Sequence, residues 1–309
     1  MGFNSQVTMK FILALIILII FSREAYTQTE GYVPSGGTQI YYRLFGTGKP
    51  LLIINGGPGM NSDGFVDLAK SLSKNNTVII YDQRGTGRST LQRLDSTTIT
   101  IQLMANDIEN LRKYLKIKQW IILGHSFGGM LASYYACVYP GNVKALILSS
   151  SGGIDLGLLS YVNTRLTARL SEQEKDSLQY WDKKIDGGDT SYFARLHRGL
   201  ALAPAYVYDR KNISTIAERL TQGNSAVNNL VWHDLREIKF DCSSRLARFN
   251  GPVLIIQGRE DIIEEKTAIT EHNVLKNSRL VFMEHCVHYG WLDRPDIYFP
   301  EIKKFLAAN

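Results

Sequence analysis

The ten residues from Trp120 to Gly129, WIILGHSFGG, constrain the fold more than any other part of this chain. An apolar, β-branched run leads into GHSFG at 124–128, and the following stretch, 130–139, contains neither glycine nor proline. This pattern predicts a strand, a sharp turn with Ser126 at its apex, and a helix that ends at Pro140-Gly141. At such a turn the serine hydroxyl projects from the edge of a sheet, and small residues two positions to either side let the strained backbone pack closely. The segment is therefore typical of a nucleophile elbow.

A serine hydroxyl is a weak nucleophile at neutral pH, so chemistry at Ser126 requires a base, a group that orients the base, and N–H donors for an oxyanion. After an elbow of this kind, the acid and the histidine come later in the chain, in loops that follow further strands. The apolar run 252–257, PVLIIQ, predicts a buried strand, and the sequence GRED follows it directly. We interpret Asp261 as the acid, with Glu260 and Glu264 as competing carboxylates.

The base is expected after the next short strand pattern, residues 279–283. The sequence EHCVHYGW follows and contains two histidines, His285 and His288. We predict that His288 is the base, because it opens the segment HYGWLDRP, which leads into a terminal amphipathic helix at about 296–306. His285 is the competing candidate. A histidine in a loop is more often an ordinary surface residue than a catalytic one, so only one of the two is expected to act as the base.

Two backbone amides are candidates for the oxyanion hole. The amide of Phe127 follows the nucleophile directly, and a second donor is expected in a loop after an earlier strand. The apolar strand pattern 51–54 is followed by NGGPG at 55–59. Gly57 is the predicted donor, because glycine lets the backbone approach a tetrahedral intermediate and Pro58 has no N–H to offer. The alternative is an ordinary glycine-rich turn.

Three motifs together resemble a known family. NGGPG at 55–59 is similar to an HGGPG loop, DQRGTGRS at 82–89 to a DQRGxGxS segment, and GHSFGG at 124–129 to a GxSxGG elbow. In this combination the chain resembles the prolyl iminopeptidase-like family of α/β-hydrolases, over roughly residues 38–150 and from 251 to the end. Asn55 and Val287 depart from the family pattern, at positions where histidine and glycine are usual. Neither departure removes a candidate triad residue, and the charged residues of the DQRG segment are expected to pair with one another.

The resemblance implies an α/β-hydrolase fold, with a mostly parallel central sheet flanked by helices. Residues 28–150 and 251–309 would form the two parts of one core. Residues 151–250 change to an almost wholly helical pattern, with stretches at 161–184, 192–201 and 214–220, which predicts a helical cap over the carboxyl edge of the sheet. Such a cap would cover Ser126 and select the substrate.

The function implied is that of a serine hydrolase that works through an acyl-enzyme, as an aminopeptidase that releases N-terminal proline or a similar residue from peptides. A carboxylesterase or lipase-like hydrolase with the same triad is the first alternative, and a non-catalytic binding protein of this fold is the second. No cofactor or metal is expected. An aminopeptidase needs a carboxylate for the substrate ammonium, and the cap offers several by residue type without matching the family's acidic segment: Glu172, Glu174, Asp182, Asp209, Glu218, Asp234 and Glu237.

The N-terminus is expected to be a targeting segment. Residues 11–21 form an unbroken apolar run after Lys10 and before polar residues. Eleven helical residues extend about 16 Å, whereas a bilayer core is about 30 Å thick. We therefore predict a signal peptide over residues 1–27 and a secreted or periplasmic protein, with retention as a short membrane anchor as the alternative.

Composition excludes several other classes of partner and site. The chain has 309 residues, 44% of them hydrophobic and 21% charged, which is ordinary for a globular protein. Its formal charge of +6 is spread along the sequence, so nucleic acid is not an expected partner and a small peptide or other small molecule is. Cys137, Cys242 and Cys286 are odd in number and lack metal-ligand spacing, so they predict no disulfide framework and no cysteine nucleophile. The sequence does not indicate an oligomeric state.

Overall fold

The computed structural model describes residues 28–309; the predicted signal segment, residues 1–27, lies outside the described residues. Eight strands form one sheet in the order β1-β2-β4-β3-β5-β6-β7-β8. The pairs β1/β2 and β2/β4 are antiparallel and every other neighbouring pair is parallel. The strands are β1 (Gln28–Ser35), β2 (Thr38–Phe45), β3 (Lys49–Ile54), β4 (Asn76–Tyr81), β5 (Trp120–His125), β6 (Val143–Ser149), β7 (Val253–Gly258) and β8 (Ser278–Met283).

Helices cover both faces of this sheet because its central strands are apolar on both sides. In β3, Leu52 and Ile54 belong to the core beneath one layer of helices, while Leu51 and Ile53 belong to the core beneath the other. Each such buried side chain stabilises the fold by about 1.5–3 kcal/mol. The predicted α/β-hydrolase fold with a mostly parallel sheet is confirmed.

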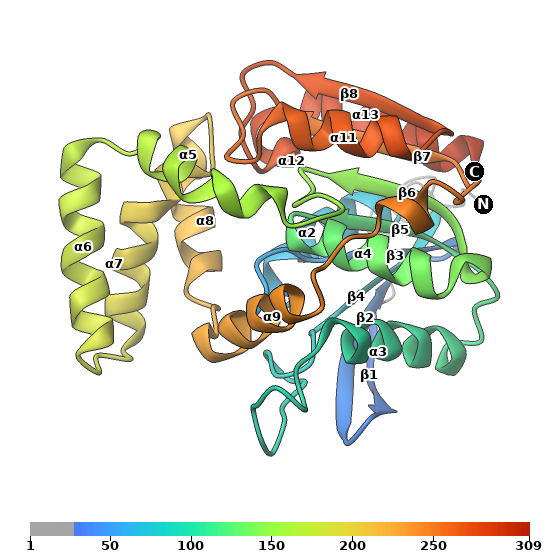
Figure 1. Cartoon of the computed structure of the whole chain (residues 1–309), viewed down its shortest axis with the longest axis horizontal. Helices are drawn as coiled ribbons and strands as arrows, with labels where there is room; N and C mark the ends of the chain where they lie inside the picture. Colours follow the sequence, from blue (N-terminus) through green and yellow to red (C-terminus); the bar gives the residue numbers. More distant parts are fainter. Residues whose placement is uncertain (1–27) are drawn as a thin grey trace, which may run out of the picture.

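The two helical layers come from different parts of the chain (Figure 1). One core is covered by α3 and α4 and the other by α2 and the terminal helix α13. The core helices are α2 (Val66–Leu72), α3 (Ile101–Tyr114), α4 (Phe127–Val138), α11 (Glu265–Val274), α12 (Gly290–Asp293) and α13 (Pro295–Ala308). No helix between residues 28 and 309 combines the length and the apolar character that a membrane span requires.

Between β6 and β7 the chain forms helices and no strand of the sheet. They are α5 (Val162–Ala168), α6 (Glu172–Asp186), α7 (Tyr192–Leu202), α8 (Ile213–Leu220), α9 (Ser225–Glu237) and the short α10 (Ser243–Leu246). Figure 1 shows α6, α7 and α8 as a lobe beside the sheet, with α7 packed against both of the others. We call residues 151–250 the cap.

Two features of the cap differ from the sequence-based expectation. The stretch 161–184 is not one helix, because Ser171 starts a new one: its side chain accepts the Glu174 amide N–H while the Glu174 carboxylate accepts the Ser171 N–H. This capping box ends the continuity of the predicted helix. The second difference is α9, which was absent from the predicted stretches and which forms one wall of the cavity described below.

Candidate active site

Ser126 lies at the turn between β5 and α4, with the backbone angles φ 56° and ψ −124°. A positive φ is strained for a residue with a Cβ and costs on the order of 1–3 kcal/mol. The flanking glycines make the turn possible, since a Cβ on Gly124 would lie 2.3 Å from the Gly128 carbonyl oxygen, and one on Gly128 would lie 2.1 Å from that of Ile54. Helix α4 begins at Phe127, directly after the serine and three residues earlier than the periodicity indicates.

The structure brings His288 and Asp261 together. His288 Nδ1 lies 2.8 Å from Asp261 Oδ1, and both side chains are buried. The Ile263 amide also donates to Asp261 Oδ1, at 3.1 Å, and the His288 amide donates to the carbonyl oxygen of Tyr206 in the cap, at 3.1 Å. An ionised carboxylate at Nδ1 favours the tautomer with the proton there, which leaves Nε2 as an acceptor.

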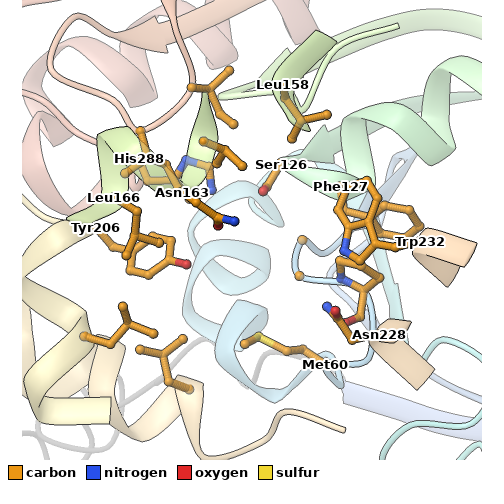
Figure 2. Close-up of a pocket in the computed structure, with 18 of the residues that line it drawn as sticks. Met60, Ser126, Phe127, Leu158, Asn163, Leu166, Tyr206, Asn228, Trp232 and His288 are labelled. Atoms are coloured by element: carbon orange, nitrogen blue, oxygen red, sulfur yellow. The ribbon is translucent and has the colours of Figure 1, made fainter. Parts of the chain in front are cut away.

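His288 and Ser126 both line one cavity (Figure 2). Their side chains form no hydrogen bond with each other within the described chain. Catalytic hydrogen bonds are commonly long in the unliganded enzyme and shorten once substrate is bound. The arrangement is thus compatible with proton transfer from Ser126 to His288.

The competing candidates lie elsewhere. His285 is exposed, and its ring stacks on Tyr208 with 5.1 Å between ring centroids. The Glu260 carboxylate accepts the amide N–H groups of His285 and Cys286. It therefore stabilises the loop that carries both histidines, and it forms no hydrogen bond with the His288 ring. Glu264 immediately precedes α11.

Gly57 and Phe127 line the cavity next to Ser126. Neither of their amide N–H groups donates to another residue of the described chain, so both are available to a ligand. Asn55, which replaces the family histidine, orders this loop: its Nδ2 donates to the Met60 carbonyl oxygen at 3.0 Å, and its own carbonyl accepts Gln83 Nε2 at 2.8 Å.

His125, which precedes the serine, is packed against the candidate base with 4.7 Å between ring centroids. Burial lowers the pKa of His125 well below its usual value, and the nearby His288 and Arg219 lower it further. Its Nδ1 lies 3.1 Å from the Ser149 carbonyl oxygen. His125 therefore remains neutral at physiological pH and supports the His288 ring without adding charge to it.

The cavity has a volume of about 600 Å³, within the range of pockets that enclose small molecules. Its wall combines apolar side chains with polar ones, and its amide-bearing and aromatic groups include Asn163, Tyr206, Asn228 and Trp232 (Figure 2). Arg198 and Arg236 also line it, and among residues 28–309 no aspartate or glutamate does. In the same part of the chain, no group of three or more His, Cys, Asp or Glu side chains is placed to hold a metal ion.

Residues 49–295 match the family described as alpha/beta hydrolase fold. The chain belongs to this family. The chain is 28% identical to a proline iminopeptidase of Lactobacillus acidophilus, with 91% of this chain and 98% of the relative aligned. It is 29% identical to a proline iminopeptidase of Saccharolobus solfataricus, over 90% of this chain and 92% of the relative. These relatives confirm the resemblance inferred from the three motifs.

Solved structures agree on the fold. A proline iminopeptidase of Mycobacterium smegmatis superposes with a TM-score of 0.69 at 23% identity, covering 91% of this chain and all of that one. An esterase of Exiguobacterium antarcticum superposes with a TM-score of 0.71 at 20% identity, covering 90% of this chain and all of that one. Since peptidase and esterase structures match equally well, the fold does not distinguish between the two activities.

Sequence reasoning missed Arg219, a cap residue that is only 4% exposed. Its Nη2 donates to the Gly56 carbonyl oxygen and its Nε to the Tyr289 hydroxyl, each at 3.2 Å. Its guanidinium lies over the Phe65 ring, 4.6 Å from the ring centroid. Arg219 thereby ties the cap of this hydrolase to the loop that carries the candidate oxyanion donor, although a single arginine in a helical pattern gives no sequence signal for such a role.

The DQRG segment meets the expectation in part, since Arg88 Nη1 lies 3.7 Å from Asp82 Oδ2 within the segment. Arg84 pairs with Asp107 on α3 at 2.6 Å, and both side chains are almost fully buried. Asp82 accepts the Ser62 hydroxyl at 2.7 Å and the Arg88 amide at 2.9 Å. The charged residues therefore pair both within the segment and with Asp107 and Ser62 outside it, and the outside contacts hold the loop to the core.

Cys286 lies in the histidine loop and is buried. Burial raises the pKa of its thiol, which keeps the thiol protonated and unreactive.

Proposed function

We propose that this chain is a serine hydrolase that forms an acyl-enzyme on Ser126. The observation that carries the proposal is the buried His288–Asp261 contact of 2.8 Å beside a strained serine elbow, in one cavity. In this mechanism His288 Nε2 takes the Ser126 proton as Oγ attacks the substrate carbonyl carbon, while Asp261 fixes the imidazole and stabilises the imidazolium.

The oxyanion that forms would be held by the amides of Gly57 and Phe127. His288 then protonates the leaving group, and a water molecule activated by the same base hydrolyses the acyl-enzyme. Every step uses groups that this chain supplies, and ester and amide substrates share the sequence of steps.

Two substrate classes are candidates. The curated relatives named proline iminopeptidase favour an aminopeptidase that releases N-terminal proline. The substrate of such an enzyme carries a free ammonium, which needs a negative partner when it is taken out of water. Asp182 pairs with the lining residue Arg198 at 2.6 Å, but it does not itself line the cavity. It is therefore not placed to bind the ammonium of a substrate in this structure.

The second candidate, a carboxylesterase, is favoured by the cavity wall. An uncharged acyl group can contact the apolar side chains of this wall, and the described wall offers no carboxylate to an ammonium. We therefore place ester hydrolysis ahead of aminopeptidase activity on structural grounds.

Activity measurements on matched variants and substrates test both the serine mechanism and the substrate class. Ser126→Ala and His288→Ala should each lower turnover by about 10³-fold or more, whereas the control His285→Ala should retain most of it, because triad members act as a unit. If His285→Ala is the inactive variant, the base has been assigned wrongly.

The substrate class is read from proline p-nitroanilide, its N-acetyl derivative and short aryl esters. An aminopeptidase should prefer the free amine over the blocked one by about 30-fold or more, because blocking leaves a buried carboxylate unpaired. Equal rates on both amides together with robust ester hydrolysis would support the esterase, and a strong preference for the free amine would reject it.

A further inference from the structure

The charges on the cavity wall are of one sign. Arg198 and Arg236 line the cavity, and within the described chain no acidic side chain does. Arg198 is already committed, since its Nε donates to Asp182 Oδ1 at 2.6 Å. Arg236 takes part in none of the ion pairs and side-chain hydrogen bonds found among residues 28–309. It is exposed as well as lining the cavity, so it stands where the cavity meets solvent.

Helix α9 carries Arg236 on the face that lines the cavity of the reacting serine. Asn228, Trp232 and Arg236 recur every four residues, so they share one face of the helix, and all three line the cavity. Asn228 Nδ2 donates to the Pro58 carbonyl oxygen at 2.8 Å, which fixes this end of the face to the loop of the candidate oxyanion donor.

The next turn of this face lies against the elbow. The Trp232 ring packs edge-on against Phe127, with 6.2 Å between ring centroids (Figure 2). At a rise of about 1.5 Å per residue, Arg236 lies about 12 Å further along the helix axis than Asn228. The Trp232 ring therefore lies between the elbow and Arg236 along this face of the helix. Apolar side chains such as Leu158 and Val162 line the same cavity.

We infer that the acyl group of the substrate is an aliphatic chain that ends in a carboxylate, which Arg236 binds while Ser126 attacks the ester carbonyl at the other end. The substrate class is therefore the monoesters of aliphatic dicarboxylic acids. The inference rests on the proposed serine hydrolase function. In the reaction the Ser126 Oγ–C bond replaces the ester C–O bond, the serine proton passes through His288 to the leaving alcohol, and water then releases the dicarboxylate.

Three p-nitrophenyl esters of equal chain length test the inference: hexanoate, the monoester of adipate and 6-aminohexanoate, with kcat/KM corrected for each ester's rate with hydroxide. An ion pair at a partly exposed site is worth up to about fivefold in binding. The anionic ester should therefore exceed the neutral one by up to about fivefold, and it should exceed the cationic ester by about 20-fold.

Variants at one position connect the preference to its cause. Arg236→Gln should lower the ratio of kcat/KM for the adipate monoester to that for hexanoate by about fivefold, and Arg236→Glu should reverse the order of the charged esters. The matched control is Arg245→Gln, which removes an equal charge from an exposed position that does not line the cavity. It should leave the ratio unchanged.

The outcomes separate this inference from the proposed function. If Ser126-dependent turnover is intact but the cationic ester is preferred, or if the ratio does not respond to Arg236, the inference is overturned and the serine hydrolase stands. If Ser126→Ala has no effect on turnover of the esters, both are overturned.

Discussion

Arg219→Met should separate catalysis from stability in this protein. The guanidinium of Arg219 is buried, and its hydrogen bonds to the Gly56 carbonyl oxygen and the Tyr289 hydroxyl are each 3.2 Å long. Gly56 directly precedes Gly57, whose amide is the proposed oxyanion donor. Methionine preserves an unbranched side chain of similar bulk but removes the donors, so the loop loses the contact that fixes its position.

The expected loss follows from the hydrogen bonds. A hydrogen bond to a charged group contributes about 1.5–3 kcal/mol, and these two are at the long end of the usual range. We therefore expect kcat/KM on an aryl ester to fall by about 10- to 30-fold. The loss should appear in kcat, because a misplaced oxyanion donor weakens interactions made only in the transition state.

Stability should respond differently. No carboxylate pairs with Arg219 among residues 28–309, and burying an unpaired charge costs several kcal/mol. Removing the charge offsets the lost hydrogen bonds, so the free energy of unfolding in urea should be unchanged or higher. Arg195→Met, an exposed cap arginine, serves as the control and should change neither quantity. Unchanged kcat/KM would refute the positioning role of Arg219, and a parallel fall of kcat/KM and stability would show that its role is packing.

Three further predictions concern other parts of the chain. Glu271 is 1% exposed, and burial raises its pKa from 4.5 to about 8, while the neighbouring Ser151 side chain opposes part of this rise. Stability should therefore fall as pH rises from about 4.5 to about 8, and between about pH 6 and 9 the wild type should lose about 3 kcal/mol more unfolding free energy than Glu271→Gln; parallel pH profiles would contradict this. Gly128→Ala should destabilise by about 3 kcal/mol or more in thermal denaturation, because its Cβ meets the Ile54 carbonyl oxygen, while Gly141→Ala, whose Cβ meets nothing within 4 Å, should not. A chain that begins at Gln28 should fold and hydrolyse substrate without detergent, since every contact described lies within 28–309; a requirement for residues 1–27 would reject their assignment as a signal peptide.

Local patterns in the sequence were sufficient to predict the elbow and the strands around it. Gly124 and Gly128 are required by the turn itself, because a Cβ atom at either position would lie 2.3 or 2.1 Å from a backbone carbonyl oxygen. The strand predicted at 252–257 is observed as Val253–Gly258. His288 and Asp261 were predicted from their places after successive strands, and parallel strands bring such loops to the same edge of the sheet.

The cap and the charge of the cavity could not be predicted in this way. Arg219 binds Gly56 and Tyr289, which are distant from it in sequence. None of the acidic cap residues considered from the sequence lines the cavity, because the direction in which each side chain points depends on how the cap helices pack. Helix α9 was not among the predicted helical stretches. Its start is nevertheless marked by Asn224, whose side chain accepts the amide N–H groups of Ala226 and Val227 as an N-cap.

The most direct test of the account is to identify the residue that becomes covalently modified. A fluorophosphonate reacts with an activated serine and stops at the stage that mimics the acyl-enzyme, and mass spectrometry of the digested protein locates the adduct. The account predicts a single adduct on the peptide that contains Ser126, much slower labelling of His288→Ala, normal labelling of His285→Ala and no labelling of Ser126→Ala. An adduct on another residue, or ester hydrolysis that survives in Ser126→Ala, would contradict it.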